Sequence, residues 1–266
     1  MARRAVNLHG CALPHFALLL RPLRRIGQLR VPFVPSSRYA TVCMYGSTKV
    51  PVRGRVVLEG IRFAASVASA PSAVVALWKT ATGGKVVGCL PANPVPEVLF
   101  ASNLLPVALE SPEDLSLGSG HIDAWLTGTD LFPFPLQIAN APHFVFPPTN
   151  TTSMEDALDR VEALAEWGGA VSGYPVSEGT LWKSIRAYAT LRSHLDALDE
   201  RCSRETAFLA PEERHDIVRA GSFLPPEAHS RLLSSILGVD MEPAVLPAEG
   251  ERGDPLLALA KRIFAG

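Results

Sequence analysis

Apolar residues recur every three or four positions through the second half of the chain, which is the spacing of one face of an α-helix. Ser153 suits the N-cap of a first predicted helix, which we expect to end at Gly168-Gly169. Ser177 begins a second predicted helix of about 25 residues, long enough to span about 38 Å. The apolar positions are Met154, Leu158, Val161 and Ala165 in the first helix, and Leu181, Ile185, Tyr188, Leu191, Leu195, Leu198 and Cys202 in the second.

Two shorter helices are predicted to follow. Pro211 suits the first position of a helix that runs to Arg219 and stops at Gly221. Pro226 suits the start of a fourth helix, which ends at Gly238. The apolar residues of the fourth helix that we expect to be buried are Leu232, Leu233, Ile236 and Leu237.

The first half of the chain has a different pattern, in which a short apolar run leads into prolines. Residues 86–88, Val-Val-Gly, predict a short buried strand that breaks into a turn at the glycine. Pro96 then suits the first position of a short helix, with Glu97 in its first turn and Asn103 as its stop. Residues 105–107 predict the next strand. This order of strand, proline-rich turn and short helix is typical of ligand-facing loops in α/β proteins.

Charged residues are unevenly distributed along the 266 residues. Residues 1–58 hold ten of the 25 Lys and Arg residues and none of the 26 Asp and Glu residues. A basic segment without acids resembles an organelle transit peptide, and a start assigned too far upstream would give the same pattern. We expect this extension to contribute little to stability, and the protein to reside in the cytoplasm, or in an organelle matrix if the extension is a transit peptide. No nucleic-acid partner is predicted, because interleaved aromatic platforms are lacking.

No membrane span is predicted. The apolar run at residues 11–20 is too short, since a span needs about 20 residues. Residues 63–78 are uncharged up to Trp78 but are interrupted by Pro71, so they predict a buried helix. The cysteines form no C-x-x-C pair, so we expect buried or incidental thiols in a reducing compartment, with no metal ligand among them. These cysteines are Cys11, Cys43, Cys89 and Cys202.

Three stretches occur in an order that is typical of one family. Residues 85–106 have a valine-rich strand, a glycine and a helix start at Pro96-Glu97, with Val98 where a second glutamate is usual. Residues 181–192 follow a consensus similar to L-x-x-A-I-x-x-Y-N-x-x-R, and residues 220–229 are similar to A-G-x-x-x-P-x-E-E-H. Together they resemble the 2-hydroxyacyl-CoA dehydratase and benzoyl-CoA reductase family.

This chain differs from the consensus of the long helix at Ser184, and also at Ala189, where the family often has asparagine. The last six residues, Lys-Arg-Ile-Phe-Ala-Gly, are similar to the strand that opens the family's second lobe. The resemblance therefore covers about residues 85–238 and the last six.

The resemblance implies a two-lobed α/β subunit with a [4Fe-4S] cluster between its lobes, held by cysteines and facing an acyl-CoA thioester. It implies radical chemistry, in which one electron enters the thioester-conjugated system. Such clusters need thiolate ligands. The family has a first cysteine after the segment that corresponds to residues 120–126, but this chain continues directly into residues 127–130 without one. The family's second cysteine is in a Cys-Asp pair, and residues 134–137, Phe-Pro-Leu-Gln, are found at that place. The chain is therefore not expected to hold the cluster alone, and no cofactor is predicted in it.

The predicted fold class is α/β, a first lobe with a short, mainly parallel sheet plus a helical layer, and without the second lobe of the family. We expect a basic extension at 1–58, an α/β lobe at 59–150, a helical layer at 151–240, and a linker with an orphan strand at 241–266. An orphan strand leaves apolar side chains and backbone groups unpaired. The isolated chain is therefore expected to self-associate or to need a partner subunit.

Two functions follow as expectations. The chain is either a subunit-like part of a 2-hydroxyacyl-CoA dehydratase or benzoyl-CoA reductase type enzyme, acting with a second subunit of the same family, or a non-catalytic descendant that binds acyl-CoA or a partner protein. No catalytic residue is identified, so whether the chain is an enzyme stays open. Glu97 is the candidate substrate-binding residue, and compensation of the helix dipole is the alternative for it.

Several histidines are candidate functional residues. His121 and Asp123 are two positions apart, which allows either an acid–base pair or two solvent-exposed polar side chains. His143 precedes an apolar strand at 144–146 and is expected at its edge. The histidines expected to face solvent from helices are His194, His215 and His229. Gly83-Gly84 predicts a turn, without the Lys and Ser/Thr of a phosphate loop.

Overall fold

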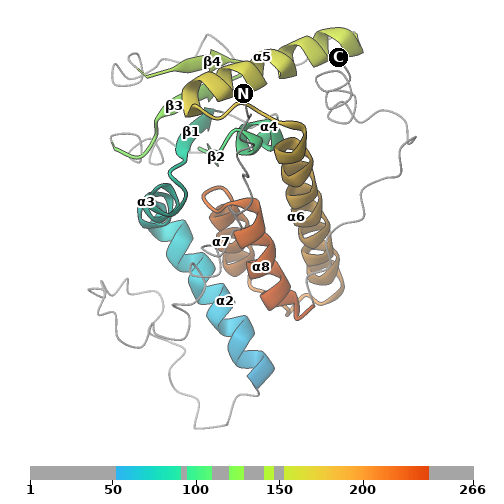
Figure 1. Cartoon of the computed structure of the whole chain (residues 1–266). Coiled ribbons are helices and arrows are strands. Elements are labelled where there is room, and N and C mark those ends of the chain that lie inside the picture. The colour runs from blue at the N-terminus through green and yellow to red at the C-terminus, as the bar shows by residue number, and fades with distance from the viewer. Residues whose placement is uncertain (1–51, 91–94, 110–119, 129–140, 147–152, 240–266) are drawn as a thin grey trace, which may run out of the picture. The chain divides into compact units, whose positions relative to one another are not determined.

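The computed structural model describes residues 52–90, 95–109, 120–128, 141–146 and 153–239, which belong to one compact unit. The protein has an α/β fold, as predicted (Figure 1). Its elements in chain order are α2 (Val52–Ser69), α3 (Pro71–Thr82), β1 (Lys85–Leu90), α4 (Pro96–Ala101), β2 (Leu104–Ala108), β3 (Ala124–Thr127), β4 (His143–Val145), α5 (Met154–Ser172), α6 (Glu178–Arg204), α7 (Pro211–Gly221) and α8 (Pro226–Leu237).

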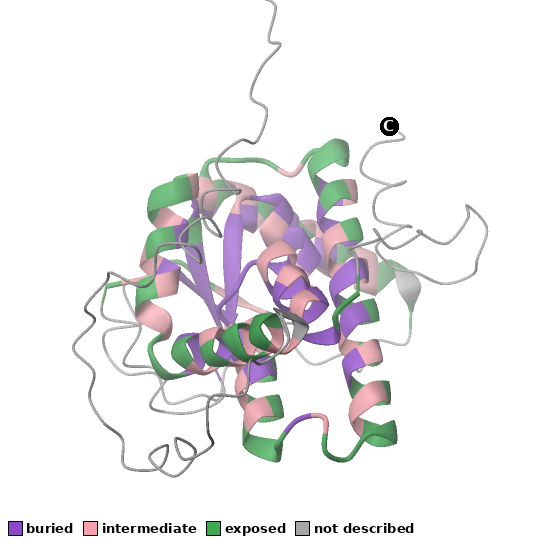
Figure 2. Ribbon diagram, turned by 90° about the horizontal axis from the view of Figure 1, so that it is seen from below, coloured by how far each residue is buried: buried purple, intermediate pink, exposed green. Residues whose placement is uncertain are grey.

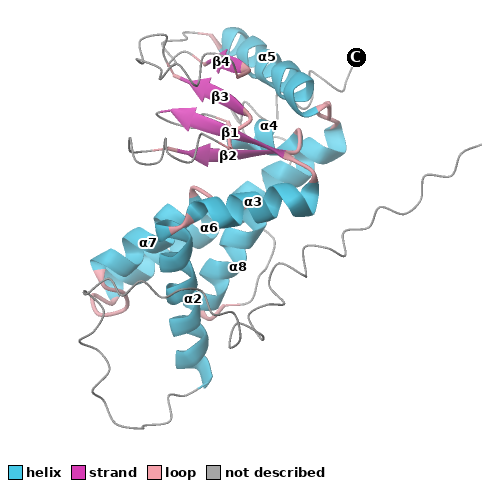
Figure 3. Ribbon diagram, turned by 90° about the vertical axis from the view of Figure 1, so that its left-hand side faces the viewer, coloured by secondary structure: helices cyan, strands magenta, loops and turns pink. Residues whose placement is uncertain are grey.

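Four parallel strands form one sheet in the order β2-β1-β3-β4, and the arrows point the same way in Figure 3. From the central strand β1 the chain passes through α4 to β2 on one side, whereas β3 lies on the other side. Leu90 at the end of β1 is in register with Thr127 at the end of β3. The space beyond these two strand ends is therefore a topological switch point, the place where doubly wound sheets bind their ligands.

Gly88 lies inside β1 and does not end it, so the predicted turn at this glycine is wrong. Trp125 is the register partner of Gly88 in β3 and is 3% exposed. A Cβ atom at Gly88 would lie 2.6 Å from the indole ring of Trp125. The glycine is thus a packing requirement of the sheet, because the ring occupies the place where a side chain would stand.

One face of the sheet carries the main hydrophobic core. Burial of β1, β2 and β3, visible as purple strands in Figure 2, explains why residues 86–90 lack charged and polar side chains. Helices α4 and α5 and the first turns of α6 cover this face. The strand residues of the core are Val87, Cys89, Leu104, Ala124 and Leu126, and the helix residues are Val98, Leu99, Ala101, Val161, Leu164, Ala165, Val171, Leu181 and Ile185.

Helix α5 begins as predicted but ends later. The Ser153 hydroxyl caps its first turn, yet the helix runs past Gly168-Gly169 to Ser172. A Cβ atom at Gly168 would lie 3.0 Å from the hydroxyl oxygen of Ser102, so this glycine allows a close approach between α5 and the end of α4. Gly173, with φ of 82°, ends the helix in the left-handed conformation that favours glycine.

Helix α6 connects the sheet with a second group of helices. It begins at the predicted cap, where Ser177 and Thr180 form a capping box, and has 27 residues. Its first turns belong to the sheet core, whereas its later turns pack against α8, which in turn contacts α2 and α7 (Figures 1 and 3). Helices α7 and α8 begin at the predicted prolines, and Gly238 ends α8 with φ of 68°.

The N-terminal boundary differs from the expected one, because residues 52–58 form the first turns of α2 and not the end of a basic extension. The apolar segment at 63–78 is divided between α2 and α3, with a break at Ala70 before the proline of α3. Within the described residues, no single helix has the length and composition of a membrane span, and only Gly54–Ser69 with Pro71–Thr82, bent by 94°, meet that test as a pair. The rest of the extension, residues 129–137 and the predicted strand at 261–266 lie outside the described residues.

Candidate functional site

Glu97 lies in the first turn of α4, which follows β1 and so starts on the ligand-binding side of the sheet. Its side chain is 4% exposed, and its Oε1 accepts a hydrogen bond from Nη1 of Arg192 at 2.5 Å. The Arg192 side chain is 55% exposed. A buried carboxylate is thus neutralised by a guanidinium group that also reaches solvent.

Helix α6 contacts α4 through three side chains spaced four residues apart, which places them on one helix face. Arg192 is the last of them. Ser184 donates to the backbone carbonyl of Glu97 at 2.7 Å. The ring of Tyr188 meets the ring of Phe100 edge to face, with 6.1 Å between centroids. The backbone, a ring and the carboxylate of α4 are therefore each fixed by one residue of α6.

Two ionisable groups near this contact have raised pKa values. Burial raises the pKa of Tyr188 well above its usual range, and the negative charges of Glu97 and Glu227 act in the same direction. The hydroxyl of Tyr188 is therefore a hydrogen-bond donor at neutral pH. Burial also raises the pKa of Glu227, with the cations Lys183 and Arg231 opposing the effect.

The arrangement is suited to binding an anion. Arg192 uses Nη1 for Glu97, and the exposed remainder of its guanidinium has the planar fork that fits phosphate or carboxylate groups. Tyr188 adds a protonated hydroxyl on the same helix face. The structure thus places Glu97 as the partner of the anion-binding candidate Arg192, and its own carboxylate is committed to the ion pair.

A second polar pair lies at the same end of the sheet. Thr127 Oγ1, at the end of β3, is 2.8 Å from Nε2 of His143 in the edge strand β4. Thr127 is buried, whereas His143 is exposed. A hydroxyl beside an imidazole nitrogen can share its proton with the base or orient a polar ligand. His143 is the first residue of β4, and its imidazole reaches the end of β3 at Thr127.

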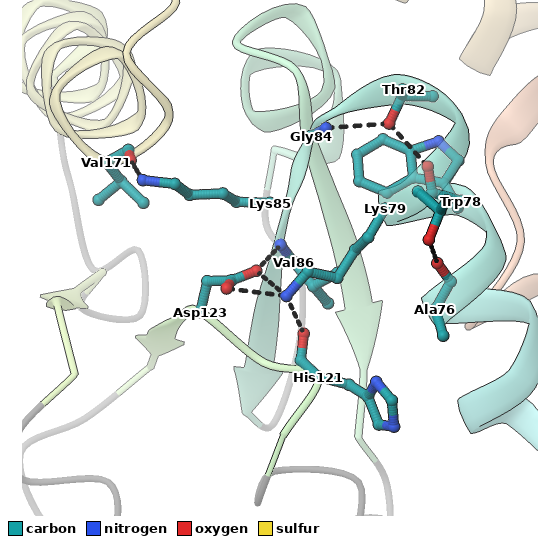
Figure 4. Close-up of polar contacts among 11 residues, drawn as sticks. Ala76, Trp78, Lys79, Thr82, Gly84, Lys85, Val86, His121, Asp123 and Val171 are labelled. Carbon is teal, nitrogen blue, oxygen red and sulfur yellow. Dashed lines mark hydrogen bonds and ion pairs between the residues drawn. The ribbon is translucent and has the colours of Figure 1, made fainter.

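His121 and Asp123 do not form an acid–base pair, and they lie at the opposite end of the sheet. The Asp123 carboxylate accepts hydrogen bonds from Lys79 Nζ and from the backbone N–H of Val86, both at 2.8 Å (Figure 4). Lys79 also donates to the carbonyl oxygen of His121 at 3.2 Å, while the imidazole points away from Asp123 (Figure 4). These contacts join α3, β1 and the turn before β3, so their role is structural.

The cysteines within the described ranges do not fit an iron–sulfur cluster. Burial raises the pKa of Cys89 far above its usual range, and burial raises the pKa of Cys202 as well. Cys89 lies close enough to Tyr188 to affect its pKa, and Cys202 follows Tyr188 by about 21 Å along α6. The two thiols therefore cannot share a cluster, and the described residues contain no group of three His, Cys, Asp or Glu side chains that could hold a metal ion.

Two of the histidines expected to face solvent are buried, which corrects the prediction. His194 is 7% exposed and His229 is 2% exposed, whereas His215 is exposed. Nε2 of His229 lies 3.1 Å from the carbonyl oxygen of Ile217 in α7. Charged neighbours in the sequence suggested solvent, but the packing of α8 on α6 and α7 selects the helix face that is buried.

The buried histidines make stability dependent on pH. Burial lowers the pKa of His229 from 6.5 to about 4, so the unfolded chain binds a proton more readily than the folded chain between these values. The stabilisation is complete above pH 6.5 and is lost as the pH falls toward 4. We expect urea denaturation at pH 4.5 to give a free energy of unfolding about 2.5 kcal/mol lower than at pH 7.5 from this residue.

The lowered pKa of His194 acts in the same direction, and the raised pKa of Glu227 opposes it. His229→Gln removes one of the titrating groups, so the variant should lose clearly less stability between pH 7.5 and 4.5. An equal loss in the variant and the parent chain would contradict the assignment to His229.

The sequence pattern indicated Glu97 but not the residues that surround it. Tyr188 is an apolar position of the predicted helix, Arg192 is a consensus position, and Ser184 departs from the consensus. Their four-residue spacing was a usable signal for one shared helix face. Arg192 lies 95 residues from Glu97, so no local pattern could pair them. No family model matches this chain, and no curated protein matches it either.

Proposed function

We propose that the chain is a subunit-like part of a 2-hydroxyacyl-CoA dehydratase or benzoyl-CoA reductase type enzyme, and that it contributes one side of an acyl-CoA site. The observation that carries this proposal is the contact of Glu97 and Phe100 in α4 with Ser184, Tyr188 and Arg192 in α6. Glu97, Tyr188 and Arg192 are positions at which two separate stretches resemble motifs of that family, whereas Ser184 departs from the consensus. Their contact next to the carboxyl end of β1 supports a common role in binding a ligand.

The side chains around Glu97 are chemically suited to binding an acyl-CoA. Coenzyme A carries phosphate groups, which the exposed fork of Arg192 can bind with charge-assisted hydrogen bonds. In this proposal the [4Fe-4S] cluster comes from a partner subunit of the same family, because the described cysteines do not fit it. The residues of this chain would bind and orient the thioester while the partner holds the redox group.

A non-catalytic module that binds acyl-CoA or a partner protein is the second candidate. The observation that favours it is the burial of Cys89, whose protonated thiol is unavailable as a ligand. The two candidates share the ligand but differ in the partner and in redox chemistry.

Binding of butyryl-CoA to the full chain, measured by calorimetry, tests the shared part of the proposal. We expect Arg192→Lys, which keeps a cation beside Glu97, to weaken binding about tenfold, because one charge-assisted hydrogen bond is worth about 1.4 kcal/mol. Arg186→Lys is the matched control, since Arg186 is exposed on the same helix, and should leave affinity unchanged. No binding by the parent chain, or equal weakening in both variants, would contradict the assignment.

The colour of the preparation separates the two candidates. The chain purified anaerobically is expected to be colourless. Visible absorbance and acyl-CoA dehydration that appear only with a copurified partner would support the subunit function. Binding of acyl-CoA without either property in any complex would support the non-catalytic module.

A further inference from the structure

Helices α6 and α8 meet along a line of polar side chains. The Ser234 hydroxyl lies 3.4 Å from Nε2 of His194, and Arg201 Nη1 donates to the carbonyl oxygen of Leu237 at 2.8 Å. The residue numbers of these contacts increase along both helices, so α6 and α8 run in the same direction. Glu227 and Ser230 precede Ser234 by seven and four residues, so all three lie on the face of α8 that meets α6.

Three polar atoms of this α6–α8 seam are buried and have no hydrogen-bond partner in the described part of the chain: Ser230 Oγ, His194 Nδ1 and Glu227 Oε2. Ser230 is 2% exposed and His194 is 7% exposed, so neither side chain reaches bulk solvent. Buried polar atoms are almost always satisfied by protein groups or by ordered water. Three such atoms on one seam therefore point to a ligand that supplies the missing bonds.

The chemistry of the three atoms selects the ligand. A hydroxyl donates and accepts, the free nitrogen of a neutral imidazole does one or the other, and a carboxylate oxygen accepts. A simple cation or anion would serve only one of these functions. Glu227 and Ser230 are neighbours on the helix surface, with Cβ atoms about 5–6 Å apart, a span that one water molecule bridges with two ordinary hydrogen bonds.

We infer that the α6–α8 seam binds ordered water at Ser230, bridging it toward Glu227 on one side and toward the Ser234–His194 pair on the other. Glu227 lies close enough to Tyr188 to affect its charge state, and Tyr188 contacts Phe100 beside Glu97. The hydrated seam would thus extend from the Glu97 cluster toward His194 through the interior. This inference does not depend on the proposed function.

The full chain tests the inference by nuclear magnetic resonance. Long-lived internal water should give cross-relaxation to the β-protons of Ser230, and this signal should disappear in Ser230→Ala. Absence of the signal in the parent chain would overturn the inference.

Thermal unfolding gives a second, independent readout. Ser193 is exposed in the middle of α6, so Ser193→Ala reports only the higher helix propensity of alanine and should raise Tm by about 1–2 °C. Ser230→Ala should instead lower Tm by about 3 °C, because the water loses an anchor. If the seam is dry, removal of an unsatisfied hydroxyl is favourable, and a rise at least as large as that of Ser193→Ala would overturn the inference.

Discussion

Gly221→Ala is expected to lower the free energy of unfolding by about 3 kcal/mol, or Tm by roughly 6–12 °C. Gly221 is the last residue of α7, and a Cβ atom there would lie 2.1 Å from Cε1 and 2.3 Å from Nδ1 of His229. The ring cannot move without leaving its place beside the carbonyl oxygen of Ile217, and it is 2% exposed. Overpacking and the lost hydrogen bond both destabilise the fold.

A double-mutant cycle isolates this contact. In a His229→Ala background the ring is absent, so Gly221→Ala should become neutral or slightly stabilising, which gives a coupling energy of about 3 kcal/mol. Gly179→Ala is the matched control, because Gly179 is in the first turn of α6 with nothing within 4 Å of the added methyl group. Additive effects of the two substitutions would show that ring and glycine do not compete for this space. The contact also gives a physical reason why a glycine and a histidine occur together in residues 220–229.

Arg192→Met is expected to cost about 3 kcal/mol of stability at pH 7. It leaves the carboxylate of Glu97, which is 4% exposed, without a counter-charge. Because the Arg192 side chain is 55% exposed, the loss of its own charge costs little stability. The cost comes from the buried carboxylate of Glu97.

Urea denaturation at pH 7 measures this effect. Adding Glu97→Gln to Arg192→Met should restore most of the loss at pH 7, since a neutral amide needs no counter-charge. A penalty that Glu97→Gln does not restore would show that the lost packing of Arg192 dominates.

Helix starts were predictable because their signals are local. A cap such as Ser153 or Ser177 closes hydrogen bonds within its own first turn, and the prolines at 96, 211 and 226 carry the backbone angle of a first helical residue. The sheet was predictable from buried apolar runs, which parallel strands require on both faces. The sequence by itself therefore determined the α/β class, the starts of α4, α5, α6, α7 and α8, and the presence of a strand at 86–88.

Interior glycines were predicted less well, because their role depends on what approaches them. Gly238 ends a helix with a positive φ, as expected from the local pattern. Gly88 and Gly168 stay within regular elements, since Trp125 and Ser102 occupy the space where their side chains would stand. Those neighbours come from other elements, so the sequence around each glycine holds no sign of them.

The candidate site shows the same division. The sequence singled out Glu97 and placed Ser184, Tyr188 and Arg192 in one helix, but it could not bring the two stretches together. Only the packing of α4 on α6 decides that Arg192 neutralises Glu97, and only the packing of α8 decides that His229 is buried. Local hydrogen bonds and helix periodicity depend on residues only a few positions apart, so the sequence shows them directly. An ion pair between residues 95 positions apart exists only once the chain has folded.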